Sequence, residues 1–136
     1  MTAASDLAPS YDLVVVGGGP AGLSTVLFDE NPGVGGQIYR GITTTPVTDR
    51  AILGEEYWAG AELAADARAS GALIVNGAVV WSLDPQKLVG VSIAGKTRLI
   101  EARRVIIATG SQERPFPIPG WTLPGVMTAG AAQTAL

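Results

Sequence analysis

The sequence predicts an α/β fold in which a parallel β-sheet is combined with a three-stranded antiparallel meander. Residues 13–16 form an apolar run that leads directly into a glycine-rich turn at residues 17–22, which is typical of a buried strand ending at a ligand site. Residues 104–109 form a second, almost wholly apolar run that stops at Gly110, as parallel strands do at a ligand crevice. Between the two runs, apolar residues recur at helical spacing over residues 49–69.

The glycine-rich turn has the G-x-G-x-x-G pattern of a dinucleotide site. Gly17 would make the tight turn, Gly19 would let the backbone approach a pyrophosphate, and Gly22 would let a helix lie against the sheet. An acid that binds the ribose is expected about 20 positions further on. Glu30 follows Gly17 by only 13 positions, so a segment of roughly the size of a helix is missing.

The connection between the first two predicted strands, at residues 11–16 and 25–28, is unusually short. It has eight residues, 17–24, whereas parallel neighbours need a crossover of about a dozen residues, usually helical. Eight residues span about 26 Å when extended and about 12 Å as a helix. These eight residues can therefore connect the two parallel strands or form a helix, but they are too few to do both. Because a helix N-terminus offers N–H groups and partial positive charge to phosphate, its loss would lower cofactor affinity severely.

The remaining elements follow from turn residues and periodicity. Residues 1–10 are small and polar, which predicts a disordered lead-in, and the glycines and proline of residues 31–46 predict a loop. A helix is expected over residues 49–69 despite two internal glycines. Prolines keep residues 115–124 extended, and an alanine-rich helix begins after residue 126. Short strands are expected at residues 72–75, 78–83, 88–93, 97–101 and 104–109, of which the second, third and fourth form the meander.

Composition excludes several classes of function. The chain has 136 residues and is 47% hydrophobic, which suits one globular domain with a buried sheet. Its net charge of −3 and the lack of any basic block argue against nucleic acid as a partner. With no apolar run long enough for a membrane span and no secretory signal, a cytoplasmic location is expected. Without Cys or His, this stretch holds no disulfide, thiolate metal site or histidine triad, so redox chemistry would need a bound cofactor.

Several motifs occur in an order that resembles a known family. The glycine turn is followed by Asp29-Glu30, by Gly35-Gly36-Gln37, by the meander and by residues 106–110, Ile-Ile-Ala-Thr-Gly. This order resembles the FAD/NAD(P)-dependent flavoprotein oxidoreductases with two dinucleotide-binding domains. Three stretches are most similar to the large subunits of opine oxidases, to hydrogen cyanide synthase and to related amine dehydrogenases: residues 35–41, residues 113–115, and residues 119–126, which read Pro-Gly-Trp-Thr-Leu-Pro-Gly-Val.

The resemblance implies a Rossmann-like FAD-binding domain that is incomplete, because its first dinucleotide helix is largely missing. It implies FAD as the cofactor, with NAD(P) bound by a following domain that is not present here. No catalytic residue and no metal ligand is assigned, because the flavin would carry the chemistry. The cofactor-binding residues that the resemblance implies are Gly17, Gly19, Pro20, Ala21, Gly22, Asp29, Glu30, Gly36, Gln37, Val79, Ala108, Thr109 and Gly110.

Three functions from different classes stay open at this point. The first is the N-terminal FAD-binding portion, residues 11–136, of an oxidoreductase that oxidises C–N bonds of amino-acid or opine-like amines. Such an enzyme would take a small-molecule amine as substrate and have partner subunits in a hetero-oligomeric dehydrogenase. The second is an incomplete, inactive flavoprotein fragment. The third is a thioredoxin-reductase-like or ferredoxin-reductase-like module.

Each candidate residue also has a purely structural interpretation. Glu30 would then be a solvated acid at a strand end, and Gly35-Gly36-Gln37 a simple loop. Tyr57 and Trp58 are expected to pack the helix against the core rather than to form a binding surface. For Glu113 and Arg114, a salt bridge and a cofactor contact are equally compatible with their place after the last strand. Arg103 and Arg104 are expected to be exposed charges at a sheet edge.

Overall fold

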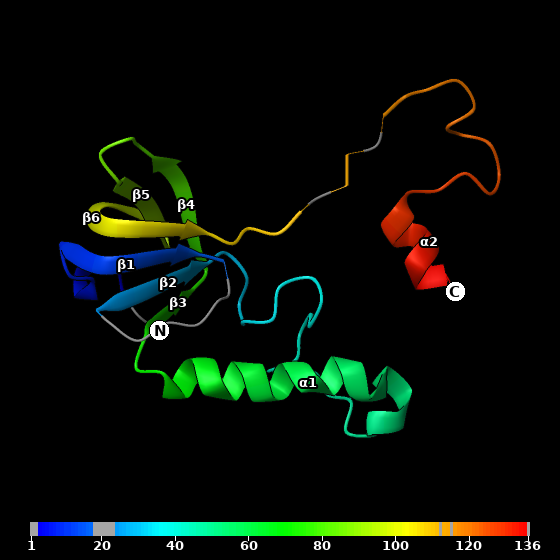
Figure 1. The fold of residues 1–136 in the computed structure, drawn as a ribbon, viewed down its shortest axis with the longest axis horizontal. Helices are drawn as coiled ribbons and strands as arrows, with labels where there is room; N and C mark the ends of the chain where they lie inside the picture. Colours follow the sequence, from blue (N-terminus) through cyan, green and yellow to red (C-terminus); the bar gives the residue numbers. More distant parts are fainter. Residues whose placement is uncertain (1–2, 18–23, 112, 115, 136) are drawn as a thin grey trace.

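The computed structural model describes residues 3–17, 24–111, 113, 114 and 116–135. A short 3-10 helix, η1, precedes six strands and two α-helices (Figure 1). Their bounds are η1 Ala4–Asp6, β1 Ser10–Val16, β2 Thr25–Asp29, α1 Arg50–Ala69, β3 Leu73–Asn76, β4 Ala78–Leu83, β5 Leu88–Ile93, β6 Lys96–Ile107 and α2 Ala129–Ala135. No helix in the described part of the chain combines the length and apolar character needed to span a bilayer.

All six strands belong to one mixed sheet in the order β3-β2-β1-β6-β5-β4. Strands β3, β2 and β1 run parallel, and β1 pairs in parallel with residues 101–107 of β6. The meander is formed by β4, β5 and residues 96–101 of β6, which pair antiparallel. The predicted fold class is therefore confirmed, but the separate strands expected at residues 97–101 and 104–109 are one continuous strand. Glu101 pairs with both Ser10 and Leu88, so β6 changes partner there without a turn.

The short connection after β1 is accommodated because β2 overlaps only the last part of β1. The register runs from Leu13 opposite Thr25 to Val16 opposite Phe28. The chain therefore has to return past only three strand residues, or about 10 Å. Eight residues easily span this distance, so the connection is long enough to join the two parallel strands β1 and β2. Most of the connection, and with it Gly19, Pro20, Ala21 and Gly22, lies outside the described residues.

The main core lies between the parallel part of the sheet and the meander, which curls over one of its faces. Val14, Val26 and Phe28 contribute from the parallel strands, and Val91 and Ile100 contribute from the meander, each at most 1% exposed. These residues alternate along their strands with residues of the opposite face, as the two-residue period of a strand requires. Every residue of β2 is buried, because this strand lies inside the sheet and is covered on both faces.

The N-terminal segment closes one end of this core. Ala4 and Leu7 belong to the main core cluster and are 5% and 3% exposed. The segment is held to β6, because an Arg98 guanidinium nitrogen donates a hydrogen bond to the Leu7 carbonyl and the Glu101 N–H donates one to the Pro9 carbonyl. Composition predicts a disordered lead-in over residues 1–10, and the described residues 3–10 differ from it because two apolar side chains find a place in the core.

A second, smaller cluster joins the loop after β2 to α1. Its buried members are Val34, Ile42 and Ala64, with Tyr57 and Trp58 packed against them. This confirms the packing role expected for the two aromatic residues. Helix α1 covers the predicted residues but is kinked at Gly54, where φ is 76° and ψ is 157°. In Figure 1 the helix runs along one side of the sheet, and the chain after β6 leads away from the sheet toward α2.

Candidate dinucleotide-binding site

Three parallel strands end side by side at one edge of the sheet. Val16 is opposite Phe28 of β2 and opposite Ile107 of β6, so β2, β1 and β6 reach this edge in register. The Gly17 N–H donates to the Phe28 carbonyl at 2.9 Å, and the Ala108 N–H donates to the Val16 carbonyl at 2.7 Å. In open α/β sheets, ligands bind outside the carboxyl ends of the strands. This edge is therefore where the predicted site residues should meet.

Gly17 is the residue at which the first strand ends, and its position admits only glycine. Its φ of 98° lies in the left-handed region, which L side chains rarely adopt. A Cβ atom there would also collide with the Ala108 carbonyl oxygen and would lie 2.6 Å from its carbonyl carbon. The glycine thus lets the ends of β1 and β6 approach closely. The tight turn expected at this residue has a clear physical basis, although the glycines that follow it lie outside the described residues.

Ala108, Thr109 and Gly110 continue from β6 along the same edge. All three are exposed, and Gly110 has a φ of 69° with open space on the side where a Cβ would stand. The strand ends at Ile107 rather than at Thr109 as predicted. The backbone beyond it is therefore open to solvent next to Gly17.

The two acids at the end of β2 have different environments. Asp29 is 6% exposed, and its Oδ1 accepts hydrogen bonds from the N–H and the side-chain Nδ2 of Asn31, both at 2.9 Å. This carboxylate therefore fixes the turn that ends the strand. Glu30 is exposed, and no hydrogen bond or ion pair joins its carboxylate to another described residue. Of the two acids, Glu30 is the one free to accept hydrogen bonds from a ligand.

Asn31 also connects the ends of β2 and β3, a role that was not predicted from the sequence. Its carbonyl accepts hydrogen bonds from the Gly77 N–H at 3.1 Å and from Asn76 Nδ2 at 3.2 Å. This contact brings the start of β4 beside the Asp29 turn, and Val79 lies two residues further along. The signal in the sequence is an Asp two residues before an Asn, directly after an apolar strand, which is typical of an Asx turn.

Gly36 and Gln37 lie on an exposed turn of the loop that follows β2. Nothing would obstruct a Cβ at Gly36, whose φ is 60°. The same loop is anchored to α1, because the Tyr57 hydroxyl donates to the Arg40 carbonyl at 2.9 Å and Val34 packs on the helix. In the described residues, the hydrogen bonds of this turn stay within the loop, and none joins it to Gly17 or Thr109.

Glu113 caps a helix, a role that neither of the two interpretations open to it included. Its Oε1 accepts a hydrogen bond from the Gly130 N–H at 2.6 Å, at the first turn of α2. Hydrogen bonds from the Thr128 side chain and from the Gly130 and Ala129 N–H groups hold the pKa of this carboxyl below its ordinary value. Within the described residues it forms no salt bridge with Arg114 or any other cation. Asp12 and Arg103 form an exposed ion pair at 3.2 Å. Arg103 is therefore exposed as expected, but it does not lie at a sheet edge, because β6 is between β1 and β5.

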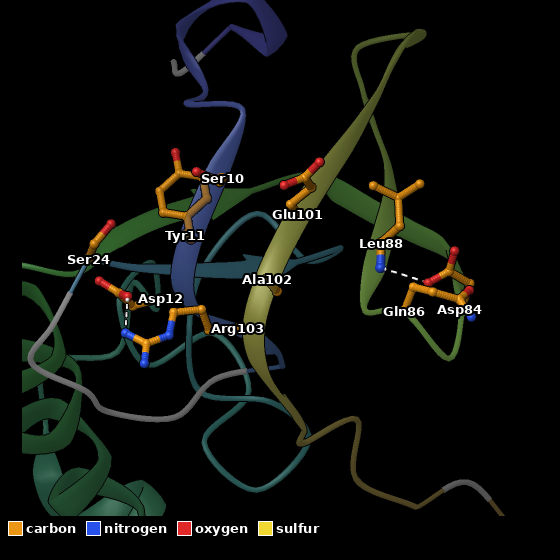
Figure 2. Close-up of a pocket in the computed structure, with 10 residues that line it drawn as sticks. All are labelled: Ser10, Tyr11, Asp12, Ser24, Asp84, Gln86, Leu88, Glu101, Ala102 and Arg103. Atoms are coloured by element: carbon orange, nitrogen blue, oxygen red, sulfur yellow. Dashed lines mark hydrogen bonds and ion pairs between the residues drawn. The ribbon is translucent and has the colours of Figure 1, made fainter.

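A shallow depression of about 530 Å³ lies away from this edge, around the start of β1 and the turn between β4 and β5 (Figure 2). Two of its charged groups are engaged by local structure, because Asp12 pairs with Arg103 and Asp84 Oδ1 accepts the Leu88 N–H at 2.8 Å, whereas Glu101 also lines the depression. It contains none of the predicted site residues. The polar groups at the carboxyl edge of the sheet are therefore the better candidates for a ligand site.

The described residues at that edge can bind a ligand, but they do not supply an acid-base pair. Glu30 is one exposed carboxylate, and Gly17 and residues 108–110 add backbone groups and the Thr109 hydroxyl. No group of three or more potential metal ligands occurs among the described residues. An exposed carboxylate beside bare backbone suits a ribose diol, because it accepts hydrogen bonds from both hydroxyls.

Comparison with known proteins defines the class. A profile of the pyridine nucleotide-disulphide oxidoreductase family matches residues 11–134, nearly the whole chain. The chain belongs to this family of oxidoreductases.

Similar curated proteins belong to multi-subunit enzymes. The opine oxidase A-subunit of Agrobacterium tumefaciens (strain Ach5) is 46% identical over 155 aligned positions, which cover 100% of this chain and 31% of that protein. Hydrogen cyanide synthase subunit HcnB of Pseudomonas aeruginosa is 39% identical over 135 positions, which cover 88% of this chain and 29% of that protein. The chain thus spans about a third of the length of the curated relatives it matches.

Solved structures agree on the fold. An L-proline dehydrogenase from P. horikoshii has a TM-score of 0.54 with 24% identity, over 74% of this chain and 22% of that one. A water-forming NADH oxidase from Lactobacillus brevis has a TM-score of 0.52 with 19% identity, over 93% of this chain and 31% of that one. At these identities the likeness concerns the fold alone.

Proposed function

We propose that this chain is the FAD-binding portion of an oxidoreductase that oxidises C–N bonds of amino-acid or opine-like amines. The observation that carries the proposal is the common edge of β1, β2 and β6, where Gly17 abuts Ala108 and the Glu30 carboxylate is free. The similarity to the opine oxidase A-subunit supports the substrate class and partner subunits, and membership of the pyridine nucleotide-disulphide oxidoreductase family supports a further NAD(P)-binding domain in the whole enzyme. A cytoplasmic location is part of the same proposal.

Different residues at this edge would contact different parts of FAD. Glu30 would accept hydrogen bonds from the adenosine ribose hydroxyls, and Asp29 would position it by fixing the turn through Asn31. The exposed backbone at Thr109 and Gly110 would border the cofactor from β6. When bound, the flavin supplies the capacity to accept a hydride from the amine carbon. The protein contributes position and electrostatics.

The length of the first connection supports a second candidate, an incomplete flavoprotein that binds FAD weakly or not at all. The alignment to the Agrobacterium tumefaciens protein runs over 155 positions, whereas this chain has 136 residues, so that relative carries 19 residues (155 − 136) that this chain lacks. We place this loss in the eight-residue connection between β1 and β2, where a crossover helix is expected. Without that helix the pyrophosphate would lose the N–H groups and partial positive charge of a helix N-terminus.

Flavin binding distinguishes the two candidates. The chain is expressed, the bound flavin is measured by visible absorbance after release, and FAD is titrated into the stripped protein. Glu30→Gln should weaken FAD binding by roughly tenfold, because a hydrogen bond to a charged group contributes about 1.5–3 kcal/mol. Glu62→Gln, an exposed acid on α1, is the matched control and should leave affinity unchanged. Equal affinities for both variants would overturn the assigned role of Glu30.

A helix insertion tests the second candidate directly. Inserting an amphipathic helix of about eleven residues after Ser24 should raise FAD affinity if the short connection is the defect. Tight FAD binding by the unchanged chain would refute the incomplete-protein candidate. In a flavin-loaded protein, bleaching by amines but not by reduced thioredoxin would support the C–N oxidation proposal over a thioredoxin-reductase-like function.

A further inference from the structure

The junction of β3 and β4 contains the dipeptide Asn76-Gly77, and an asparagine followed by glycine is the arrangement most prone to deamidation. In this reaction the backbone nitrogen after the asparagine attacks the side-chain carboxamide carbon, and glycine offers the least hindrance because it has no Cβ atom. Asn76 is half-buried and Gly77 is exposed, so water reaches the junction. The other asparagine of the sequence, Asn31, precedes Pro32, which has no N–H to lose in such an attack. Asn76 is therefore where this chemistry is expected.

In the folded chain, one backbone carbonyl accepts hydrogen bonds from both groups that must react. The Asn31 carbonyl oxygen accepts the Gly77 N–H at 3.1 Å and the Asn76 side-chain amide nitrogen, Nδ2, at 3.2 Å. The Gly77 nitrogen is the nucleophile of the deamidation reaction, and Asn76 Nδ2 is its leaving group. We call these two hydrogen bonds the Asn31 contact.

The Asn31 contact is itself fixed by the end of β2. Asp29 Oδ1 accepts hydrogen bonds from the Asn31 N–H and from Asn31 Nδ2, both at 2.9 Å, and Asp29 is 6% exposed. Asp29 and Asn76 are also register partners in the parallel pairing of β2 with β3. Attack on the Asn76 side chain therefore requires the Gly77 N–H to leave a carbonyl group that the neighbouring strand holds in place.

We propose that Asn76 is a deamidation site that the Asn31 contact protects in the folded protein. When the contact opens, the Gly77 nitrogen forms a bond to Asn76 Cγ, the Cγ–Nδ2 bond breaks, and ammonia leaves with the proton that Gly77 loses. Water then opens the resulting cyclic imide at either of its two ring C–N bonds, which gives aspartate or isoaspartate at position 76. The net reaction consumes water and releases ammonia, and it needs no oxidant or reductant.

The reaction also removes part of the contact that slows it. A carboxylate at position 76 has no N–H to donate to the Asn31 carbonyl. It also places a second negative charge next to Asp29, its register partner on β2. Deamidation should therefore weaken the turn that ends β2.

Peptide mass spectrometry of the full chain, incubated at mildly alkaline pH, measures the conversion of amide to acid at each asparagine. The rate at Asn76 should be roughly tenfold or more higher in the guanidinium-unfolded chain than in the folded chain, because unfolding removes both hydrogen bonds of the Asn31 contact. Asn31 is the internal control in the same samples and should react far more slowly than Asn76 in the unfolded chain, because Pro32 follows it.

Two variants distinguish local protection from overall stability. Asp29→Ala releases Asn31 and should raise the rate at Asn76 in the folded chain by roughly threefold to tenfold. Leu7→Ala truncates a buried side chain of the main core and leaves the Asn31 contact intact, so the rate at Asn76 should stay unchanged. A third variant, Asn76→Asp, should lower the midpoint of urea unfolding by roughly 0.5 M.

Several outcomes would overturn the proposal. These are equal rates at Asn76 in the folded and unfolded chains, no reaction in either, a rate that Asp29→Ala leaves unchanged, and equal acceleration by Asp29→Ala and Leu7→Ala. An Asn76→Asp variant as stable as the unchanged chain would refute the weakening of the turn. Circular dichroism under the incubation conditions checks that each variant is folded, and the comparison of the folded with the unfolded chain needs no variant.

Discussion

Replacing Leu7 by alanine tests whether the N-terminal segment is part of the folded core. Leu7 is 3% exposed and packs in the main cluster, and its carbonyl accepts a hydrogen bond from Arg98. Burial of a leucine side chain contributes about 1.5–3 kcal/mol, and the cavity left by truncation brings the usual cost to about 2–5 kcal/mol. Leu7→Ala should therefore lower the free energy of unfolding by about 2–4 kcal/mol, a large part of a typical domain's stability.

Urea unfolding followed by far-ultraviolet circular dichroism measures this change. With an m-value of about 2 kcal/mol/M, the midpoint should fall by roughly 1–2 M while the m-value stays the same. Ile38→Ala is the matched control, because Ile38 is 82% exposed and its truncation should change stability by less than about 0.5 kcal/mol. If Leu7→Ala behaves like Ile38→Ala, the N-terminal segment is not packed and the composition-based expectation of a disordered lead-in is right.

Three further predictions concern single contacts. Gly60→Ala would gain about 1 kcal/mol from helix propensity alone, but its Cβ would lie 2.7 Å from Tyr39 Cβ, so urea unfolding should show a net loss of about 1–3 kcal/mol. Asp29→Ala removes the acceptor for both Asn31 donors and should cost about 1–3 kcal/mol in the same assay, whereas Glu56→Ala on α1 should cost little. The Glu113 pKa is depressed in the folded state, so its cap on α2 is complete above the ordinary value of 4.5 and is lost as pH falls through the lower folded value. The Gly130 amide resonance should report this midpoint by NMR, Glu113→Gln should abolish the titration, and a midpoint at or above 4.5 would contradict the cap.

Local patterns in the sequence predicted most elements correctly. The strands at residues 78–83 and 88–93 match β4 and β5, and the helix predicted over residues 49–69 matches α1. Alternation and helical periodicity are local properties, so they can be read without knowledge of partners. The kink at Gly54 could have been anticipated from the glycine, but the contact across it, in which the Trp58 indole N–H donates to the Arg50 carbonyl at 3.3 Å, is visible only in the structure.

Where the observed elements differ from the predicted ones, the reason is a contact between residues that are far apart in the sequence. The continuity of β6 through Arg103 could not be read from the sequence, because the pair of arginines resembles a break between two apolar runs. In the structure the strand continues because β5 pairs with its first half and β1 with its second half. Leu7 likewise looks like part of a polar lead-in until the open end of the core gives it a place.

Residue types and their spacing were enough to establish the family features of this protein: the apolar strand that runs into Gly17, the acid at Glu30, and a connection too short for an ordinary crossover. Such features lie along the chain and need no partner to be recognised. The different environments of Asp29, which fixes a turn, and Glu30, which stays free, became visible in three dimensions, as did the contact of Gly17 with the backbone of Ala108. Those outcomes depend on which strands become neighbours, and neighbours are set by the packing of the whole sheet.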